Sequence, residues 1–223
     1  MAYDWDFSHV RFHTGAYLSG IGTTLLLTVL CCTIGTMGGM LVATVLRGPA
    51  VIRIPASGIV YALRGVPELV LLFFFYFFPV RQIFGVAPPT PFWCATMAFS
   101  LSLAVFVGGL FASAVDQVPA IQLLGAQAVG MSPAELVRYI YIPQIARITL
   151  PGLLAFWISI LKLTSLASVI GVPDVVYVAR IGMSENARAL EAWLTVALVY
   201  VTLVTPASLF VKKIEQLPWM RHQ

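Results

Sequence analysis

The sequence predicts an all-α membrane protein with five transmembrane helices and a cytoplasmic two-helix elbow between the third and fourth helices. Of its 223 residues, 60% are hydrophobic and only 10% are charged, and the mean hydropathy is +0.93. Soluble domains carry about 25% charged residues. Long stretches lack charge altogether, and one more polar segment between them has the pattern of two short helices. This composition excludes a water-soluble enzyme and a disordered chain.

Five segments are long and apolar enough to cross a bilayer, which requires about 20 residues per helix. The first comes from a charge-free stretch, the second ends in a run of leucine and phenylalanine, and the third is charge-free. The fourth carries a single lysine, and the fifth is charge-free after Glu191. We expect one transmembrane domain over 1–223, with helices at about 18–46, 55–78, 92–115, 150–172 and 192–211.

The basic residues predict the orientation, because cytoplasmic segments of membrane proteins are enriched in lysine and arginine. Five crossings place the two termini on opposite sides. With the N-terminus outside and the C-terminus inside, more basic residues lie in inner segments than in outer ones. The inner segments then hold Arg47, Arg53, Arg138, Arg147, Lys212, Lys213 and Arg221, and the outer segments hold Arg11, Arg81, Arg180 and Arg188.

The inner segment between the third and fourth helices, about 116–149, begins with a short helix. A helix-favouring run over 120–129 is followed by Gly130, at the position of a helix C-terminal cap, where glycine adopts the left-handed conformation without a steric penalty. Within this run stand Leu124, Gly125 and Ala126. We expect the chain to turn at Gly130 and to form an elbow with the next helix.

The second helix of the elbow begins with a strong start signal. Ser132 and Glu135 have the spacing of a capping box, and Pro133 stands at the first helical position. We expect this helix over 133–142, ending before Pro143, because proline disfavours helical geometry at the preceding residue. The elbow either lies against the lipid headgroups or forms a docking surface for a cytoplasmic partner.

Three charged residues fall within expected membrane segments, where charge is costly and usually functional. Arg64 and Glu68 share a helix face unless Pro67 unwinds the turn, and they form either a structural ion pair or the wall of a translocation path. For Lys162 there are three alternatives. It extends along its alkyl stem to the membrane interface, it pairs with Glu68, or it faces the translocation path. The hydroxyl groups that follow it line the path or bond back to the helix backbone; they belong to Thr164, Ser165 and Ser168.

No cofactor site is expected in this chain. The cysteines, Cys31, Cys32 and Cys94, lie in apolar runs and are best explained as buried hydrophobic residues. No cluster has the spacing of a metal site, no phosphate-binding loop is present, and no basic run suggests a nucleic-acid partner. If the chain does energy-dependent work, another subunit must hydrolyse the ATP.

Three segments of the sequence resemble the permease subunits of polar amino acid ABC importers. Gly130-Met131-Ser132 and Tyr141-Ile142-Pro143-Gln144 are similar to the cytoplasmic loop of binding-protein-dependent permeases. The segment 63–71 is similar to the Arg-Gly-Thr/Val-Pro signature of this family, and 158–171 is similar to its Ile-Ser-x-Leu-Lys-x-Thr-Ser-Leu segment. The chain departs from the family pattern at Leu124, where the loop glutamate is usual, and at Gly109 and Ala112, where many members carry Glu and Arg.

The resemblance implies a permease subunit in the bacterial cytoplasmic (inner) membrane that works by alternating access. It implies two ATP-binding subunits, which would hold ATP and Mg, a second permease subunit and an extracytoplasmic amino acid-binding protein. The substrate would be a polar amino acid or an opine. Glu68 follows the proline of the 63–71 segment, and in this respect the segment is similar to that of histidine and basic amino acid permeases. The degenerate loop favours a homologous but different chain as the second permease.

Two other classes of function remain to be weighed against the importer. A passive channel or membrane scaffold would need neither an ATPase partner nor an elbow. An intramembrane enzyme is disfavoured because the sequence offers no plausible set of catalytic groups. Co-purification of an ATP-hydrolysing subunit distinguishes the importer from both.

Overall fold

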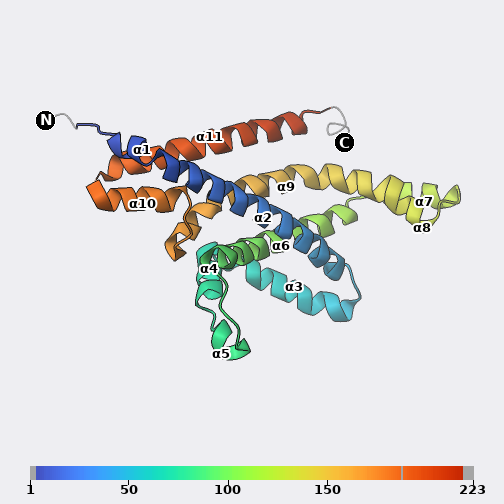
Figure 1. The fold of residues 1–223 in the computed structure, drawn as a ribbon. Coiled ribbons are helices and arrows are strands. Elements are labelled where there is room, and N and C mark those ends of the chain that lie inside the picture. The colour runs from blue at the N-terminus through green and yellow to red at the C-terminus, as the bar shows by residue number, and fades with distance from the viewer. Residues whose placement is uncertain (1–3, 187, 218–223) are drawn as a thin grey trace.

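The computed structural model describes residues 4–186 and 188–217, and within them the chain is helical with no strand (Figure 1). A short helix, α1 (Ser8–Phe12), precedes the membrane segments. Four helical segments are long and apolar enough to cross a membrane, and the count is five if a bent pair of shorter helices forms one crossing. The four are α2 (Thr14–Leu46), α6 (Pro91–Asp116), Pro133–Ile170 and α11 (Ala189–Glu215).

The first, third and fifth predicted helices are close to those observed. α2 begins at Thr14, earlier than predicted, and ends at Leu46. α6 differs from the predicted helix by one residue at each end. α11 extends beyond the predicted 192–211 at both ends, to Glu215. Arg221, which contributed to the predicted orientation, lies outside the described residues.

The centre of the molecule is the pair α2 and α6, whose backbones approach closely at glycines. A Cβ at Gly39 would lie 2.6 Å from Cγ1 of Val107, and a Cβ at Gly35 would lie 2.8 Å from the Leu103 side chain. A Cβ at Gly108 would overlap Val42. Small residues are favoured between membrane helices because lipid is as apolar as the side chains, so close backbone packing must supply the attraction.

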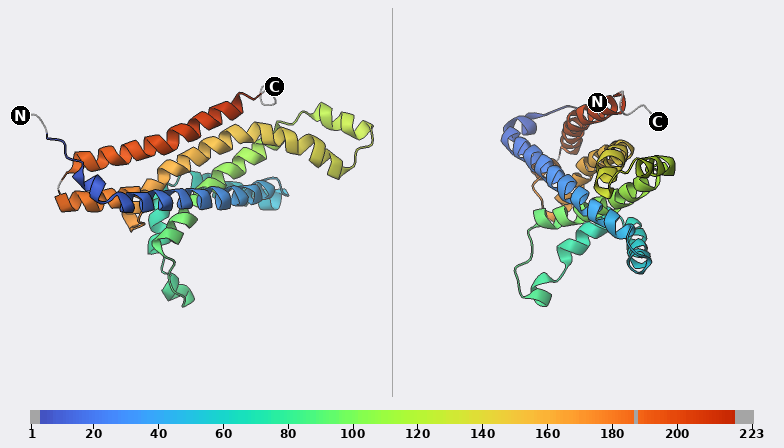
Figure 2. Two further views of the ribbon diagram at one scale, coloured as in Figure 1. Left: turned by 45° about the horizontal axis from the view of Figure 1, so that its top comes forward. Right: turned by 90° about the vertical axis from the view of Figure 1, so that its right-hand side faces the viewer.

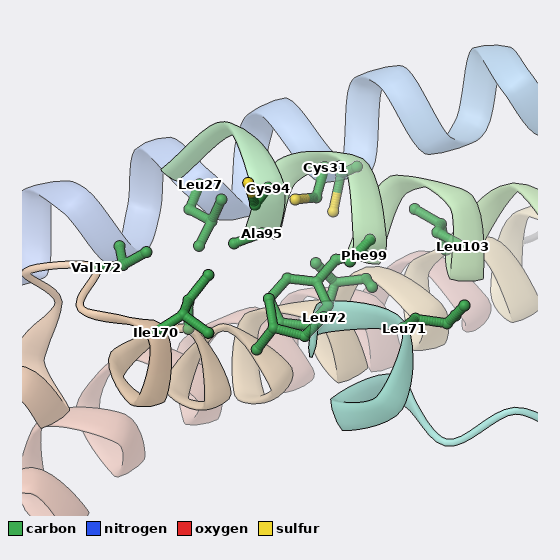
Figure 3. Packing of buried hydrophobic residues seen from close by; sticks show 14 of the residues in the cluster. Leu27, Cys31, Leu71, Leu72, Cys94, Ala95, Phe99, Leu103, Ile170 and Val172 are labelled. Atoms are coloured by element: carbon green, nitrogen blue, oxygen red, sulfur yellow. The ribbon is translucent and has the colours of Figure 1, made fainter. Parts of the chain in front are cut away.

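A hydrophobic cluster fills the space between this pair, α4 and the segment that follows α9 (Figure 3). Phe99 of α6 and Leu72 of α4 are fully buried at its middle, together with Leu27 and Cys31 of α2. The three cysteines are buried and free, as expected from their apolar surroundings. α6 is the most enclosed crossing, with 50% of its apolar window buried, against 11% for α11.

The predicted second helix, 55–78, is wrong as a continuous element. The structure divides it into α3 (Ala50–Arg64) and α4 (Glu68–Phe77), which meet at an angle of 102°. Proline disfavours the α conformation at the residue before it and has no N–H to donate, so Pro67 ends the helix and starts a new one. Arg64 and Glu68 therefore lie on different helices and do not share a face.

The predicted elbow forms, but its second helix does not end before Pro143. After α7 (Ala120–Ala128), a continuous helical segment runs through α8 (Pro133–Leu136), η1 (Val137–Tyr141) and α9 (Ile142–Leu163). η1 is a π-helix. Proline in an α-helix clashes with the carbonyl four residues earlier, and the wider i→i+5 bonding of the π-turn before Pro143 accommodates it.

The predicted fourth crossing, 150–172, is correspondingly part of a longer element. α9 passes directly into a 3₁₀-helix, η2 (Thr164–Ile170), which ends at Gly171 with φ +90°. The longest helix that was not predicted is α10 (Val175–Asn186), which follows η2 and packs against α2 and α11. Between α4 and α6, the short α5 (Val80–Phe84) projects away from the bundle (Figure 1).

Short helices lie at two opposite ends of the molecule. α1 and α10 lie together at one end, and α7 and α8 extend from the other (Figure 2). The first end is held by Arg188, whose Nη1 donates to the Asp4 carbonyl at 2.6 Å and to Oε1 of Glu191 at 3.1 Å. α9 spans most of the distance between the two ends.

Candidate functional site

A pocket of about 770 Å³ opens between η2, α10 and α11, and we call it the α10–α11 pocket. This volume lies within the range of small-molecule sites, about 300–1,000 Å³. Its polar lining residues come from α9, η2, α10 and α11 and carry two positive charges with no carboxylate. They are Lys162, Ser165, Ser168, Arg180, Tyr200 and Thr205. The remaining lining is mainly valine, with Trp193.

Lys162, predicted near the middle of a crossing, lies in the last turn of α9 and is exposed at the pocket. No described carboxylate forms an ion pair with it, so pairing with Glu68 is not observed. Arg180 of α10 reaches the same pocket and its Nη1 donates to the Ser168 carbonyl at 3.4 Å. The two cations give the pocket a preference for negatively charged or carboxylate-bearing ligands.

The hydroxyl groups after Lys162 bond back to the backbone, one of the two roles that the sequence left open. Thr164 Oγ1 donates to the Leu161 carbonyl at 2.7 Å, and Thr164 is fully buried. Ser165 and Ser168 donate in the same way, at 2.8 and 2.9 Å, yet both also line the pocket. Their oxygens remain able to accept a hydrogen bond from a ligand, since a hydroxyl is both donor and acceptor.

The turn between η2 and α10 contains a fully buried carboxyl group, Asp174. It begins α10 as an N-cap, because its Oδ1 accepts the Tyr177 N–H at 2.8 Å, while Oδ2 has no partner. Burial raises the pKa of Asp174 to about 7, and backbone hydrogen bonds and Arg180 act against this increase. The backbone of Asp174 packs against Gly20 of α2, where a Cβ would come within 3.0 Å.

The elbow has the geometry that the sequence predicted at its bend. Gly130 has φ +78°, its N–H bonds to the Gln127 carbonyl, and the Met131 N–H bonds to the Ala126 carbonyl, which together form a Schellman motif. The Ser132–Glu135 capping box is complete, with the Ser132 N–H 2.8 Å from Oε2 of Glu135. Local hydrogen bonds therefore fix the chain on both sides of the bend.

One face of the elbow is apolar and uncovered within the described residues. Ile121, Leu124 and Val129 are 75%, 61% and 79% exposed, whereas Ala126 is buried. Gly125 has open space around its Cα. The elbow is attached to α9 by a hydrogen bond of 2.5 Å from Nε2 of Gln144, next to Pro143, to Oε1 of Gln122. Leu124 thus presents an apolar surface where an acidic residue is usual in the loop that this segment resembles.

Of the predicted path residues, Arg64 and Glu68 lie outside the α10–α11 pocket. Glu68 occupies the first turn of α4 and is partly exposed, with no ion pair to a described residue. Arg64 packs on α6, where its Nη2 donates to the Val105 carbonyl at 3.3 Å. The structural ion pair between these two residues, one of the two predicted alternatives, is not present.

Sequence reasoning missed the polar pocket residues that come from α10 and α11, which are Arg180, Tyr200 and Thr205. Arg180 was assigned to an outer connection because no helix was predicted between 172 and 192. A signal for α10 was present: Asp174 is a favoured N-cap residue, and the buried Val175, Val176 and Ala179 follow at helical spacing. Tyr200 had no distinguishing pattern within its apolar segment.

A membrane-spanning helical bundle with a capped elbow at one end, and a largely apolar pocket that contains two cationic side chains, agrees with the class of transport permeases. The chain matches the model of one such family, the binding-protein-dependent transport system inner membrane component, over residues 35–218. The protein belongs to this family. It is a permease subunit and not an enzyme, since ATP hydrolysis in these importers takes place in separate subunits.

Relatives and a solved structure agree with this assignment. The chain is 34% identical over 203 residues to the octopine transport system permease protein OccM of Rhizobium radiobacter, covering 84% of this chain and 80% of OccM. It is 30% identical over 181 residues to OccQ of the same organism, covering 77% and 76%. The crystal structure of an amino acid ABC transporter with histidines matches with a TM-score of 0.85 and 29% identity, covering 96% and 99%.

Proposed function

We propose that this permease imports a polar amino acid or an opine, by alternating access, with energy from partner subunits. The observation that carries the proposal is the helical connection between the elbow and the α10–α11 pocket. The elbow continues through η1 into α9. Lys162, in the last turn of α9, and residues of η2, which follows directly, line the α10–α11 pocket. Movement of a partner bound at the elbow would therefore reach the pocket through one continuous helical segment.

The partners at the elbow are proposed to be two ATP-binding subunits, one on each permease chain, and these subunits would bind ATP and Mg. The exposed Ile121, Leu124 and Val129 supply an apolar contact surface for one of them. Closure of the two subunits on ATP would bring the elbows together and open the path outward. An extracytoplasmic binding protein would then deliver substrate at the end formed by α1 and α10.

The second permease subunit is proposed to be a homologous but different chain. Support comes from the relatives: the chain is similar to both OccM and OccQ, two different octopine transport system permease proteins of Rhizobium radiobacter. The apolar residue at Leu124 agrees with an unequal pair, in which the other chain supplies the acidic loop contact. The orientation proposed for this chain has the N-terminus outside and the C-terminus inside, with the elbow in the cytoplasm.

The substrate class rests on the relatives and on the lining of the pocket. One relative is named as a permease of an octopine transport system, and the similar solved structure is that of an amino acid ABC transporter with histidines. Octopine and histidine both carry a carboxylate and basic nitrogen atoms. Lys162 and Arg180 are suited to the carboxylate, and Ser165, Ser168 and Tyr200 are suited to polar groups. Glu68, at the start of α4, is proposed to line the path and to favour a basic or zwitterionic substrate.

Co-purification and reconstitution test the proposal. The tagged chain should purify with an ATP-binding subunit and a second permease subunit. In liposomes containing ATP, the complex with its binding protein should accumulate at least one member of a panel of L-arginine, L-histidine, L-glutamate and octopine. Entry of the substrate without ATP, up to but not above its outside concentration, would instead indicate a passive channel. A chain that purifies without an ATPase and moves none of the panel would contradict the proposal.

A further inference from the structure

A second cavity, of about 530 Å³, lies between α3 and α6 and is separate from the α10–α11 pocket; we call it the Arg64 cavity. It extends from Arg64 toward Asp116, the last residue of α6, and so opens toward the end of the molecule where α7 begins. Ser57 and Tyr61 of α3 and Ser113 of α6 add polar groups to its wall. The cavity therefore lies on the elbow side of the bend between α3 and α4.

Arg64 brings a positive charge deep into the membrane segment. It is the last residue of the 15-residue α3, and at 1.5 Å per residue it lies about 20 Å along that helix from Ala50. The hydrocarbon core of a bilayer is about 30 Å thick. A guanidinium is never deprotonated in a protein, so this charge must be stabilised by its surroundings or by a ligand.

The described residues provide Arg64 with no anion. Its guanidinium carbon lies 5.6 Å from the centre of the Phe106 ring, and Nη2 makes one long hydrogen bond, to the Val105 carbonyl. Nε is buried and has no hydrogen-bond partner. Asp116 is the one described carboxylate that lines the cavity, and it is bound to Nη1 of Arg47 at 2.6 Å. Asp116 also lies about 10 Å along α6 from Gly109, the residue on which the Arg64 guanidinium rests.

Gly109 creates the space in which the guanidinium lies. A Cβ at this position would overlap Nη2 of Arg64 and would come within 2.9 Å of its guanidinium carbon. Any other residue at 109 would therefore displace Arg64 from α6. An acidic side chain here would also supply the missing anion from within the chain itself. With glycine, the positive charge is held against α6, and the one described acid that lines the cavity, Asp116, is bound to Arg47.

We propose that Arg64 binds the carboxylate of the substrate in this cavity, as an inner site on the route from the α10–α11 pocket to the cytoplasm. The inference rests on the proposed function, because it takes the substrate to be an amino acid or an opine. Guanidinium–carboxylate hydrogen bonds are short and strong, and the planar group can engage both carboxylate oxygens. Every amino acid carries such a carboxylate, so this site recognises the class of substrate rather than one side chain.

The test measures substrate binding to the purified complex of permease and ATP-binding subunits, without the binding protein. The probe is the radiolabelled member of the uptake panel that the wild-type complex accumulates best, with its carboxamide derivative as competitor. Arg64→Gln should weaken binding about tenfold or more, since hydrogen bonds to charged groups contribute at this level. Arg64→Lys should give an intermediate affinity. The carboxamide should compete at least about tenfold less well than the carboxylate.

Gly109→Glu provides a second, independent variant, because its carboxylate should occupy Arg64 and exclude the substrate. Arg53→Gln is the matched control: it removes an exposed arginine from the same helix and should bind as the wild type does. Wild-type affinity in Arg64→Gln, equal competition by the carboxamide, or no measurable binding by the wild-type complex would each overturn the inference. If Arg64→Gln fails to assemble, Gly109→Glu decides the inference, because weak competition by the carboxamide would also follow from carboxylate binding at Lys162 and Arg180.

Failure of this inference is distinguishable from failure of the proposed function. A wild-type complex that accumulates an amino acid, together with an Arg64→Gln complex that binds it normally, would remove only the inner site. A wild-type complex that accumulates no member of the panel would contradict the proposed function itself.

Discussion

At the scale of single residues, the glycines of α2 differ in their surroundings, and two groups of them show the contrast. Gly35 and Gly39 face α6 and leave no room for a side chain, whereas a Cβ added at Gly15 or Gly22 would meet no neighbouring atom within 4 Å. The first group sets the distance between the two central helices. The second group is replaceable, and alanine there should favour the helix. The same residue type in one helix thus has two physical roles.

Gly39→Ala should destabilise the protein by about 1–3 kcal/mol, the usual cost of overpacking a well-packed site. The new methyl group would meet the fully buried Val107 and lie 3.1 Å from the Ala104 carbonyl. Gly22→Ala, in the same helix, should be neutral or slightly stabilising. Thermal unfolding in detergent measures both. Equal melting temperatures for the two variants would contradict the close α2–α6 packing.

Asp174→Asn should change how stability depends on pH. The folded chain holds the proton of Asp174 more tightly than the unfolded chain does, since burial raises its pKa from 3.8 to about 7. The stabilising contribution of the protonated group is therefore complete below pH 4 and is lost as the pH rises toward 7. Asparagine keeps the N-cap and has no proton to lose.

The measurement is the unfolding temperature of wild type and Asp174→Asn between pH 5 and pH 8. The decline with rising pH should be smaller in the variant. Asp116→Asn is the control, because Asp116 is exposed and paired with Arg47. Identical pH profiles for the wild type and Asp174→Asn would show that burial of this carboxyl group does not affect stability.

Glu68→Gln should reduce uptake by about tenfold while assembly and basal ATP hydrolysis are maintained. The structure leaves Glu68 without an ion pair to any described residue, so the substitution should break no internal contact. Uptake by reconstituted complex, compared with the recovery of assembled complex, separates transport from folding. Normal uptake would remove Glu68 from the path, and poor assembly would point to a structural role.

At the scale of elements, the glycine end of α7 and the capped start of α8 could be predicted, but the connection to α9 could not. Ser132, Glu135 and Gly130 act through bonds to their immediate neighbours, and such local signals are legible in sequence. Whether a helix stops or continues at Pro143 depends on the π-turn and on packing of the segment beyond it. The break at Pro67 and the continuation at Pro143 show that proline alone does not decide the outcome.

Gly130→Val should weaken coupling between ATP hydrolysis and transport. A β-branched residue in the left-handed conformation is strained by about 1–2 kcal/mol, which should misalign α7 and α8. Nothing lies within 4 Å of the position, so conformational strain rather than a clash is tested. Gly125→Ala, in the open helical position of α7, is the matched control. Substrate-stimulated ATP hydrolysis should fall only in Gly130→Val, and unchanged stimulation would deny Gly130 a special role.

At the scale of the whole molecule, the apolar crossings and the general class could be predicted because membrane insertion requires long charge-free helices. The arrangement of the polar groups could not. The α10–α11 pocket combines Lys162 with Arg180 and Tyr200, and the Arg64 cavity depends on Gly109, which lies in a different helix. Such sites arise from packing between segments far apart in the chain, and the periodicity of one segment carries no information about them.

Cysteine labelling should establish the orientation of the chain. Ser184 of α10 and Ser132 of the elbow are both exposed and lie toward opposite ends. Ser184→Cys should react with an impermeant thiol reagent applied outside the cell, and Ser132→Cys should react only after permeabilisation. The native Cys31, Cys32 and Cys94 are buried and should stay silent. The reverse pattern would invert the proposed topology.

The continuous helical segment Pro133–Ile170 has a torsional consequence, because its winding differs along its length. An α-helix advances 100° per residue and a 3₁₀-helix advances 120°. Rewinding the seven residues of η2 to the α form would turn one end relative to the other by about 140°. Ser165 and Ser168 would then rotate around the helix axis, and the segment would shorten by about 3.5 Å. Movement of the elbow along this segment would thus be converted into rotation of η2, and different side chains would then line the α10–α11 pocket.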